Sequence, residues 1–494
     1  MKGKFLKSVG KISLLGGMVI LSSCGKEVSN VTGWEYNEPK NGGFEVQYFE
    51  EQETGPGLLF IEGGKFTMGR VEQDVMADWT NVPRTQSVSS FYMDETEVSN
   101  KHWREYVYWL ERVFGMDYPE VVAKALPDTL VWRSELAYMD PYVELYYRHP
   151  AYADYPVVGV NWLQTQDFCV WRTDRVNEMI LIREGVLKIN PQQVAEDNYN
   201  YDAYLLGQYE GLVKADLEDL NPNAETRKVR IEDGIFLPRY RLPTESEWEF
   251  AALGLIGNTF DERINDRRLY PWNGHWVRNK DEEFRGQMMA NYTRAKGDRM
   301  GVAGALNDHA DVTTDIYDYW PNDYGLYHMA GNVSEWVMDV YRPLTLEDGD
   351  EFRSFRGNVF QTWLRDDEGY IAEKDSLGRM IQRNVDNEHP EDDLANRRNY
   401  ERSDNINIYD GDFKSSVYYY DESRQETNYS MKNMYEHSKT TLISNRTRVY
   451  KGGNWEDRTY WLVPGTRRFL DERQATRTIG FRCAMHRVGK QSQF

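Results

Sequence analysis

Apolar residues recur at helical spacing between Ser99 and Gly115. They follow an i, i+3, i+4, i+7 pattern at Trp103, Tyr106, Val107, Leu110 and Phe114. A helix with this spacing buries one stripe of side chains, and a serine just before it caps the first turn. The pattern therefore predicts a helix that begins after Ser99 and stops at Gly115.

Shorter apolar runs predict strands and a second helix. Residues 58–69 (LLFIEGGKFTMG) contain an apolar strand, a Gly63-Gly64 turn and a second short strand, and residues 88–97 form another strand pattern. The extended segment 156–162 (PVVGVNW) leads into a helix that carries Phe168, Cys169 and Trp171. The chain is therefore expected to mix short strands with helices.

Thr244 and Glu247 indicate a third, short helix. Their spacing is that of a capping box, in which each side chain accepts a hydrogen bond from the other residue's backbone amide. A glycine at the far end is a common helix stop. We therefore expect a helix over Ser246–Leu253 that ends at Gly254.

The first 23 residues resemble a bacterial lipoprotein signal. Four lysines flank or precede the apolar run Ile12–Leu21, which is too short to span a bilayer core of about 30 Å. Small residues then lead into Cys24, as at a lipidation site. An ordinary secretory signal followed by an unrelated cysteine is the alternative. Lipid on Cys24 would anchor an exported domain to a membrane.

The rest of the chain is expected to form one large domain. Residues 24–57 are polar and predict a lipid-anchored tether, residues 58–487 the folded domain, and residues 488–494 a tail. Long polar or irregular segments interrupt the domain and are interpreted as insertions. They cover about 115–155, 172–236 and 343–440.

The charge balance argues against nucleic-acid partners. The chain has 59 basic and 80 acidic residues, a net charge of −21, and removal of the signal with its four lysines makes this −25. An acidic surface repels phosphate backbones. Aromatic residues make up 14% of the chain, which suits a loop-rich fold packed by rings.

Two cysteines, Cys169 and Cys483, remain after signal removal. In an oxidising compartment, two cysteines far apart in sequence are candidates for a disulfide. Two buried, unreactive thiols are the alternative.

Several ordered fragments together resemble one known family. RLPTESEWEFAALG (241–254), NDYGLYHMAGNVSEW (322–336) and the pair GGNW and GFRC (452–483) are the most specific. The segments 63–69, 93–100, 156–162, 270–274 and 290–292 occur with them in order. This set resembles the formylglycine-generating-enzyme, or sulfatase-modifying-factor, domain. The resemblance implies a single α+β domain, related to C-type lectins, with little regular secondary structure.

Four further features narrow the resemblance to a smaller group of proteins. They are the signal, the tether (32–45) and the segments 62–76 and 167–185. They are similar to the gliding-motility lipoproteins of Bacteroidetes, most of all to the GldJ type, with the GldK and PorK types as close relatives. This implies an assembly component of type IX secretion and gliding, with GldK- and GldN-type ring subunits as partners. It also implies an outer-membrane lipoprotein, for which we expect the periplasmic face.

The family's enzymes use two reactive cysteines that bind copper between the GGNW-like and GFRC motifs. Soft thiolates are needed to hold Cu(I). The corresponding stretch, Glu456–Ala475, contains no cysteine, so we expect no copper and no oxidase activity. Related iron enzymes use closely spaced histidines, and here no two histidines lie within ten residues of each other. A metal-dependent enzyme with distant ligands and a lectin-like binder of glycan or peptidoglycan are the alternatives.

The family resemblance also implies structural sites. Cys169 and Cys483 match a structural disulfide. A first calcium site, with oxygen ligands, would use Asn291, Tyr292, Asp298 and Met300. A second would use His328, Gly331, Val333 and Glu335, although His328 stands where the family has Asp or Asn, and imidazole is a poor calcium ligand.

The sequence also contains candidate glycosylation sites and candidate ion pairs. Thr129 and Ser376 lie in short D-[S/T]-aliphatic motifs that fit Bacteroidetes O-glycosylation. Arg241 and three glutamates are predicted to form a charge network at the start of the short helix, with Trp248 in the core. Three further arginines are predicted to pair with buried acids: Arg467, Arg468 and Arg482.

Overall fold

The computed structural model describes residues 27–49, 51–78, 81–254, 268–294, 310–342, 352–385, 419–421, 426–428 and 446–489. The signal segment, Cys24 and much of the predicted 343–440 insertion lie outside these residues. The chain divides into two compact units. One contains residues 1–48 and 216–227, and the other contains residues 49–215 and 228–494.

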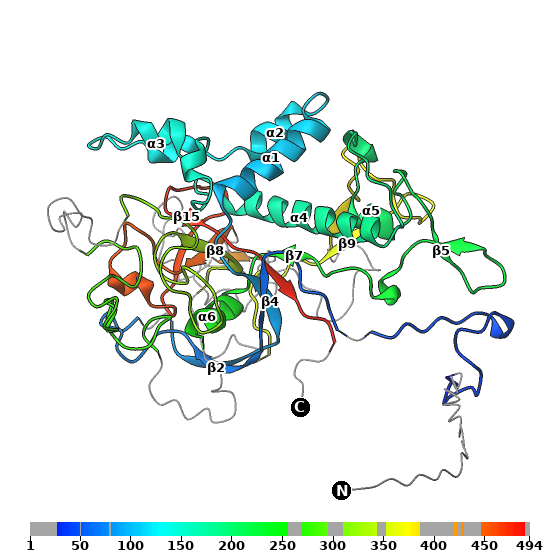
Figure 1. Cartoon of the computed structure of the whole chain (residues 1–494), viewed down its shortest axis with the longest axis horizontal. Helices are drawn as coiled ribbons and strands as arrows, with labels where there is room; N and C mark the ends of the chain where they lie inside the picture. The colour runs from blue at the N-terminus through cyan, green and yellow to red at the C-terminus, as the bar shows by residue number, and fades with distance from the viewer. Residues whose placement is uncertain are drawn as a thin grey trace, which may run out of the picture. The chain divides into compact units, whose positions relative to one another are not determined.

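The larger unit contains a four-stranded antiparallel sheet with the order β1-β4-β16-β7 (Figure 1). Its strands are β1 (Leu58–Ile61), β4 (Phe91–Asp94), β16 (Ala484–His486) and β7 (Tyr240–Arg241). A strand from the last described segment therefore fills an interior place, hydrogen-bonded on both sides. All four residues of β4 are buried.

A second four-stranded sheet of this unit has the order β14-β13-β8-β15. Its strands are β14 (Arg468–Asp471), β13 (Thr447–Lys451), β8 (Ser334–Val340) and β15 (Ile479–Gly480). β15 runs parallel to β8, whereas the other neighbours are antiparallel. Six of the seven residues of β8 are buried, so the GNVSEW motif contributes core rather than surface.

The remaining strands of the larger unit form hairpins. β2 (Gly64–Met68) pairs with β3 (Arg84–Val88), β9 (Gln361–Trp363) with β10 (Gln382–Asn384), and β11 (Tyr419–Asp421) with β12 (Glu426–Asn428). Of the predicted Gly63-Gly64 turn, Gly63 lies between the strands and Gly64 is the first residue of β2; β1 and β2 each pair with a different strand. The single strand predicted over 88–97 is in fact the end of β3 and the separate strand β4.

The capped helices were predicted from local sequence and are confirmed. α1 (Asn100–Phe114) has Ser99 as its N-cap, whose hydroxyl accepts from the His102 amide at 3.3 Å, and it ends at Gly115. α6 (Glu245–Leu253) has the Thr244–Glu247 capping box, and Gly254 follows it with a left-handed φ of 58°.

α4 (Trp162–Arg183) is longer than the sequence predicted (Figure 1). It continues without a break into the segment that was assigned to the 172–236 insertion. The other helices are α2 (Pro119–Ala125), α3 (Asp140–Leu145) and α5 (Tyr201–Leu205). Short 3₁₀ turns are η2 (Thr129–Trp132), η3 (Pro150–Tyr152), η4 (Ala195–Asp197), η5 (Ile231–Asp233) and η8 (Thr459–Leu462).

Aromatic rings join the helices to the chain just before β16. The ring of Trp103 in α1 stacks on Phe168 in α4, with centroids 5.4 Å apart, and Phe481 packs edge-on against both. All three side chains are almost completely buried. Stacked and edge-on ring pairs add stability beyond the area they bury. The predicted α+β fold with short elements and a ring-rich core is thus observed.

The smaller unit contains part of the predicted tether. Its described residues hold the 3₁₀ turn η1 (Pro39–Asn41) and the two-stranded pair β5 (Leu217–Glu218) and β6 (Thr226–Arg227). Glu45 forms an ion pair with Arg227 and accepts a hydrogen bond from the Leu220 amide at 3.0 Å. Residues that sequence composition assigned to a plain tether therefore make specific contacts with residues 216–227.

Candidate functional site

A cavity of about 260 Å³ lies against the segment where the resemblance places the reactive cysteines. One wall comes from residues 70–78 together with Asn81, and the other from residues of the 459–467 stretch. Leu269 and Tyr270 also contribute. Among the described residues that line the cavity, there is no cysteine and no histidine. The stretch that would carry thiol chemistry in a relative therefore presents hydroxyls, aromatic rings and Arg467 to the cavity, and the carboxylates of Asp74 and Asp78 line the other wall.

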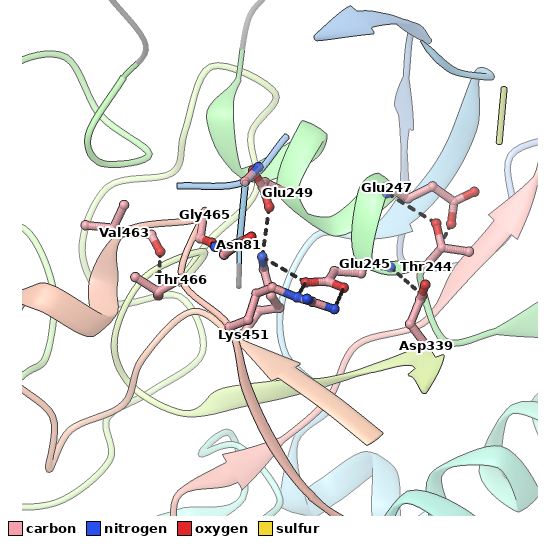
Figure 2. A network of polar contacts seen from close by, with 12 residues as sticks. Asn81, Thr244, Glu245, Glu247, Glu249, Asp339, Lys451, Val463, Gly465 and Thr466 are labelled. Atoms are coloured by element: carbon pink, nitrogen blue, oxygen red, sulfur yellow. Dashed lines mark hydrogen bonds and ion pairs between the residues drawn. The ribbon is translucent and has the colours of Figure 1, made fainter. Parts of the chain in front are cut away.

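Close backbone contacts fix the 459–467 wall (Figure 2). Thr466 donates its hydroxyl hydrogen to the Val463 carbonyl at 2.8 Å, and Asn81 Nδ2 donates to the Gly465 carbonyl at 2.6 Å. A Cβ on Gly465 would lie 2.3 Å from the Gly69 carbonyl oxygen, so only glycine fits there. The two walls are thus tied together at Gly465.

Arg467 connects this wall to a buried cluster of charged side chains. Its guanidinium donates two hydrogen bonds to Glu245, at 2.6 and 2.8 Å. Lys451 Nζ lies 2.8 Å from a Glu249 oxygen and 3.4 Å from Glu245 (Figure 2). Glu249 also accepts a hydrogen bond from the Gly69 amide at 2.8 Å. The cluster therefore braces both walls of the cavity from inside the core.

The pKa values in this cluster follow from burial and pairing. Burial raises the pKa of Glu245, but Arg467 and Lys451 more than offset it and hold the value at about 2. Burial also raises the pKa of Glu249, against the opposing effect of Lys451. Asp339 has its pKa raised to about 7 by burial and by the nearby charge of Glu245. Charge in a dry environment persists only where a partner compensates it.

The predicted charge network at the start of α6 is present, but it is divided into two separate groups of ion pairs. Arg241 makes a bidentate pair with Glu247, at 2.6 and 2.7 Å, outside the Lys451 cluster. Glu245 and Glu249 face Lys451 instead. Trp248 is completely buried, as predicted. Lys451 was missed because a lone lysine before GGNW gives no sequence signal of burial.

A second buried cluster surrounds Arg482. The guanidinium donates to both oxygens of Glu335, at 2.6 and 2.7 Å, and Trp248 Nε1 donates to Glu335 at 2.7 Å. Glu97 lies near, and burial followed by the charge of Glu335 raises its pKa well above the ordinary value. The three predicted arginine pairs are confirmed. They are Arg467–Glu245, Arg468–Asp457 and Arg482–Glu335.

The residues predicted for a second calcium site are brought together, but their side chains already have partners. His328 Nε2 donates to the Asp315 carbonyl at 3.0 Å, and burial lowers the pKa of His328 to about 4. The carboxylate of Glu335 is held by Arg482. Gly331 and Val333 belong to the same turn, and the Val333 amide donates to Glu97 at 3.2 Å. This donor set fits a calcium ion poorly, because its one carboxylate is already neutralised.

Only part of the first predicted calcium site lies within the described residues. Asn291 is buried, and its Nδ2 donates to the Val312 carbonyl at 2.8 Å. Tyr292 is buried next to it, and its hydroxyl contacts the sulfur of Met288 at 3.4 Å. Asp298 and Met300 lie outside the described residues. In the parts of the chain that are described, no three His, Cys, Asp or Glu side chains converge as metal ligands would.

Cys169 on α4 and Cys483 beside β16 lie next to each other in the core. Their sulfur atoms are 3.6 Å apart as two thiols, and both residues are about fully buried. The Cys483 amide donates to Asp94 at 2.8 Å, which fixes the backbone at this point. The positions suit the predicted disulfide, which stays a prediction.

The modification motifs lie on the surface or outside the described chain. Thr129 is half-buried in η2, whereas Ser376 is exposed in a turn whose amides are bonded to Asp375. Cys24 is not among the described residues. No helix in the described part of the chain has both the length and the apolar character to cross a bilayer.

Comparison with known proteins decides the family. The sequence profile of the sulfatase-modifying factor enzyme 1-like domain matches residues 44–393, more than half of the chain. The chain belongs to this family. Its members include active enzymes and proteins named as inactive.

Two mouse relatives illustrate this range. The inactive C-alpha-formylglycine-generating enzyme 2 of Mus musculus is 23% identical over 318 residues, which cover 61% of this chain and 73% of the relative. The formylglycine-generating enzyme of the same species is 24% identical over 298 residues, covering 57% of this chain and 58% of the relative. Among solved structures, PvdO from Pseudomonas aeruginosa is 13% identical with a TM-score of 0.38, covering 87% of this chain and 94% of PvdO.

Proposed function

We propose that this chain is a non-catalytic, lipid-anchored assembly component of type IX secretion and gliding, of the GldJ type. The observation that carries the proposal is the lining of the cavity. Hydroxyls, aromatic rings and an arginine stand where the family's enzymes need two thiolates, and Glu456–Ala475 contains no cysteine. Thiolate-held copper is the chemistry of those enzymes. A relative named as inactive is also consistent with the proposal.

The proposal includes an outer-membrane position and defined partners. The lipoprotein signal ending at Cys24 supports the anchor, and the acidic surface makes nucleic acid an unsuitable partner. We propose GldK- and GldN-type ring subunits as the partners, from the resemblance of residues 32–45, 62–76 and 167–185. A cell with Cys24→Ser should lose the outer-membrane pool of the protein in fractionation.

The decisive test is a deletion strain with matched complementation. Deletion should abolish secretion of type IX substrates and spreading on agar, and wild-type protein should restore both. A cross-linked pull-down from outer membranes should recover ring subunits. Normal secretion in the deletion strain would exclude the proposed function. Stoichiometric copper or iron in the purified protein, together with loss of complementation on metal removal, would favour a retained enzyme instead.

We retain structural calcium at the Asn291 set as a proposal separate from the assembly function. Asn291 and the Tyr292 carbonyl would supply oxygen ligands, and calcium there would cross-link the loop to the core. Elemental analysis of the purified protein after dialysis should find calcium above the buffer level. Calcium at the buffer level, with unchanged melting temperature in a chelator, would reject it.

A further inference from the structure

The cavity contains a buried hydrogen-bond acceptor that lacks a donor. Asn81 is only 3% exposed, and its Nδ2 is used by the Gly465 carbonyl. Its Oδ1 has no hydrogen-bond partner among the described residues, although Asn81 lines the cavity. Buried polar atoms without partners are rare, because each one costs the free energy of its lost hydration. A water molecule or a ligand that donates a hydrogen bond would satisfy this acceptor.

Two carboxylates, those of Asp74 and Asp78, line the same cavity. Asp74 accepts from the Met76 and Asp78 amides, at 2.9 and 3.2 Å, so its carboxylate is held in place. Burial, followed by the charges of Asp74 and Asp78, raises the pKa of Tyr460 to about 12. The hydroxyl of Tyr460 therefore lies in a field that favours positive charge nearby.

The two arginines that line the cavity already interact with other groups of the protein. Arg467 is committed to Glu245 through two hydrogen bonds. Arg70 also already has interactions within the protein. An anionic ligand would thus meet carboxylates and find no unengaged arginine. A cationic ligand would find carboxylates and an open acceptor.

The size and rings of the cavity fit one side chain. A volume of about 260 Å³ is below the range of about 300–1,000 Å³ usual for drug-sized ligands. Tyr270, Tyr460 and Trp461 contribute rings to the lining. Aromatic rings pack well against the aliphatic stem of a basic side chain and attract its charged end.

We propose that this cavity binds a lysine or arginine side chain of a partner polypeptide, whose N–H groups donate to Asn81 Oδ1 and to Asp74. The inference rests on the assembly function proposed above and names the chemistry of one contact. A partner with an exposed basic residue would complement a chain of net charge −21.

The first test uses small probes and the full mature protein in detergent. Nα-acetyl-arginine amide and Nα-acetyl-lysine amide are titrated by calorimetry at low salt, with Nα-acetyl-citrulline amide as the neutral isostere of arginine. At least one basic probe should bind with a Kd of about millimolar, and citrulline amide at least about tenfold more weakly. Raising the salt should weaken only the basic probes.

Asp74→Asn tests the carboxylate with little risk to the fold, because asparagine keeps one oxygen for the Met76 amide. Binding of the basic probe should fall at least about tenfold. The control is Glu105→Gln, the same charge change in a separate cavity of about 330 Å³ that contains Glu97 and Arg172, and it should leave binding unchanged. If Asp74→Asn unfolds in circular dichroism, the arginine–citrulline comparison on wild-type protein remains decisive.

The second test identifies the source of the ligand in cells. A photo-crosslinking amino acid at Gln73, an exposed residue of the cavity lining, should capture a polypeptide through a segment that contains lysine or arginine. The same amino acid at Glu105 is the control and should not capture that segment.

Equal binding of citrulline and arginine amides, binding of N-acetylglucosamine in preference to both, or no binding at all would overturn this inference. These outcomes leave the deletion phenotype untouched. Conversely, a cavity that binds arginine amide in a protein whose deletion does not impair secretion would reject the assembly role and keep the cationic site.

Discussion

Lys451 shows how strongly one buried residue contributes to the stability of this fold. Its side chain is completely buried between Glu245 and Glu249, and its backbone belongs to β13. Glu245 has a second partner in Arg467, but the Lys451 ammonium is the only cation that Glu249 meets among the ion pairs of the described residues. Loss of the lysine would thus leave the Glu249 carboxylate in the core with the Gly69 amide but without a cation.

Replacing Lys451 with methionine should lower the free energy of unfolding by about 3–5 kcal/mol, the usual cost of leaving a buried charge unpaired. Urea denaturation followed by fluorescence would measure it. The control is Lys101→Met, because Lys101 pairs with Asp154 at the surface and should contribute less than about 1 kcal/mol. Equal effects of the two substitutions would contradict the role of the cluster.

His328 should make stability depend on pH. Its folded pKa of about 4 lies below the ordinary 6.5, so between these values the unfolded chain takes up a proton that the folded chain refuses. This contribution is fully present above pH 6.5 and is lost as the pH falls towards 4. The loss is about 3 kcal/mol, since one pKa unit corresponds to 1.36 kcal/mol.

Asparagine at position 328 is the matched variant, because it tolerates the left-handed φ of 53° found there. Between pH 7 and pH 4.5, wild-type protein should lose about 2–3 kcal/mol more stability than His328→Asn in urea denaturation. Parallel pH profiles of the two proteins would show that the imidazole does not titrate in this way.

The sequence identified several charged residues of the core, but it did not identify the residues with which they pair. Arg467, Arg468 and Arg482 were expected to pair with acids, and they do. Glu97 and Lys451 were missed. The reason is that burial of a charge depends on partners from distant segments, such as Glu335 for Arg482, and no local pattern encodes that distance.

At the scale of elements, local capping determines the helices. Asn161 Oδ1 accepts from the Gln164 amide at 2.9 Å, and Gln164 Oε1 accepts from the Asn161 amide at 2.8 Å. This capping box starts α4, which carries Phe168 and Cys169 into the core. The starts of α1 and α6 were predictable from sequence because their signals lie within four residues.

Asn161→Ala should therefore destabilise the protein by about 1 kcal/mol, measured by thermal or urea unfolding. Asn161→Asp keeps a side-chain acceptor for the Gln164 amide and should cost little. A large loss in both variants would mean that position 161 matters for packing and not for capping.

Strand pairing was much less predictable. β1 and β2 adjoin in sequence but belong to different sheets, and β8 pairs with β13 and β15 from more than 100 residues later. Such ladders depend on the whole fold and not on the residues of one strand. The cavity was unpredictable for the same reason, since its walls come from residues 70–81 and 459–467.

At the scale of the whole molecule, Cys169 and Cys483 bring distant parts of the larger unit next to each other. The sulfur atoms of Cys169 and Cys483 lie 3.6 Å apart across 314 residues of sequence. In protein purified without reductant and with free thiols blocked, peptide mapping should recover the two as one cross-linked peptide. Recovery of both as free thiols would reject the disulfide.

The oxidised protein should also be more stable than the reduced one, by up to about 4–5 kcal/mol in the chain-entropy model for so long a loop. Urea denaturation with and without reductant measures this difference. The Cys169→Ala/Cys483→Ala protein is the control, and its stability should not respond to reductant.

The position of β16 between β4 and β7 determines when this sheet can be completed. In the described part of the sheet, residues 484–486 join β4 to β7, so the sheet has a gap until those residues arrive. Pairing across such a sequence distance is slow, because loop closure precedes any gain from contacts. During synthesis, the earlier strands must therefore wait with open edges. A chaperone that shields these edges would have its greatest effect on this protein before β16 is available for pairing.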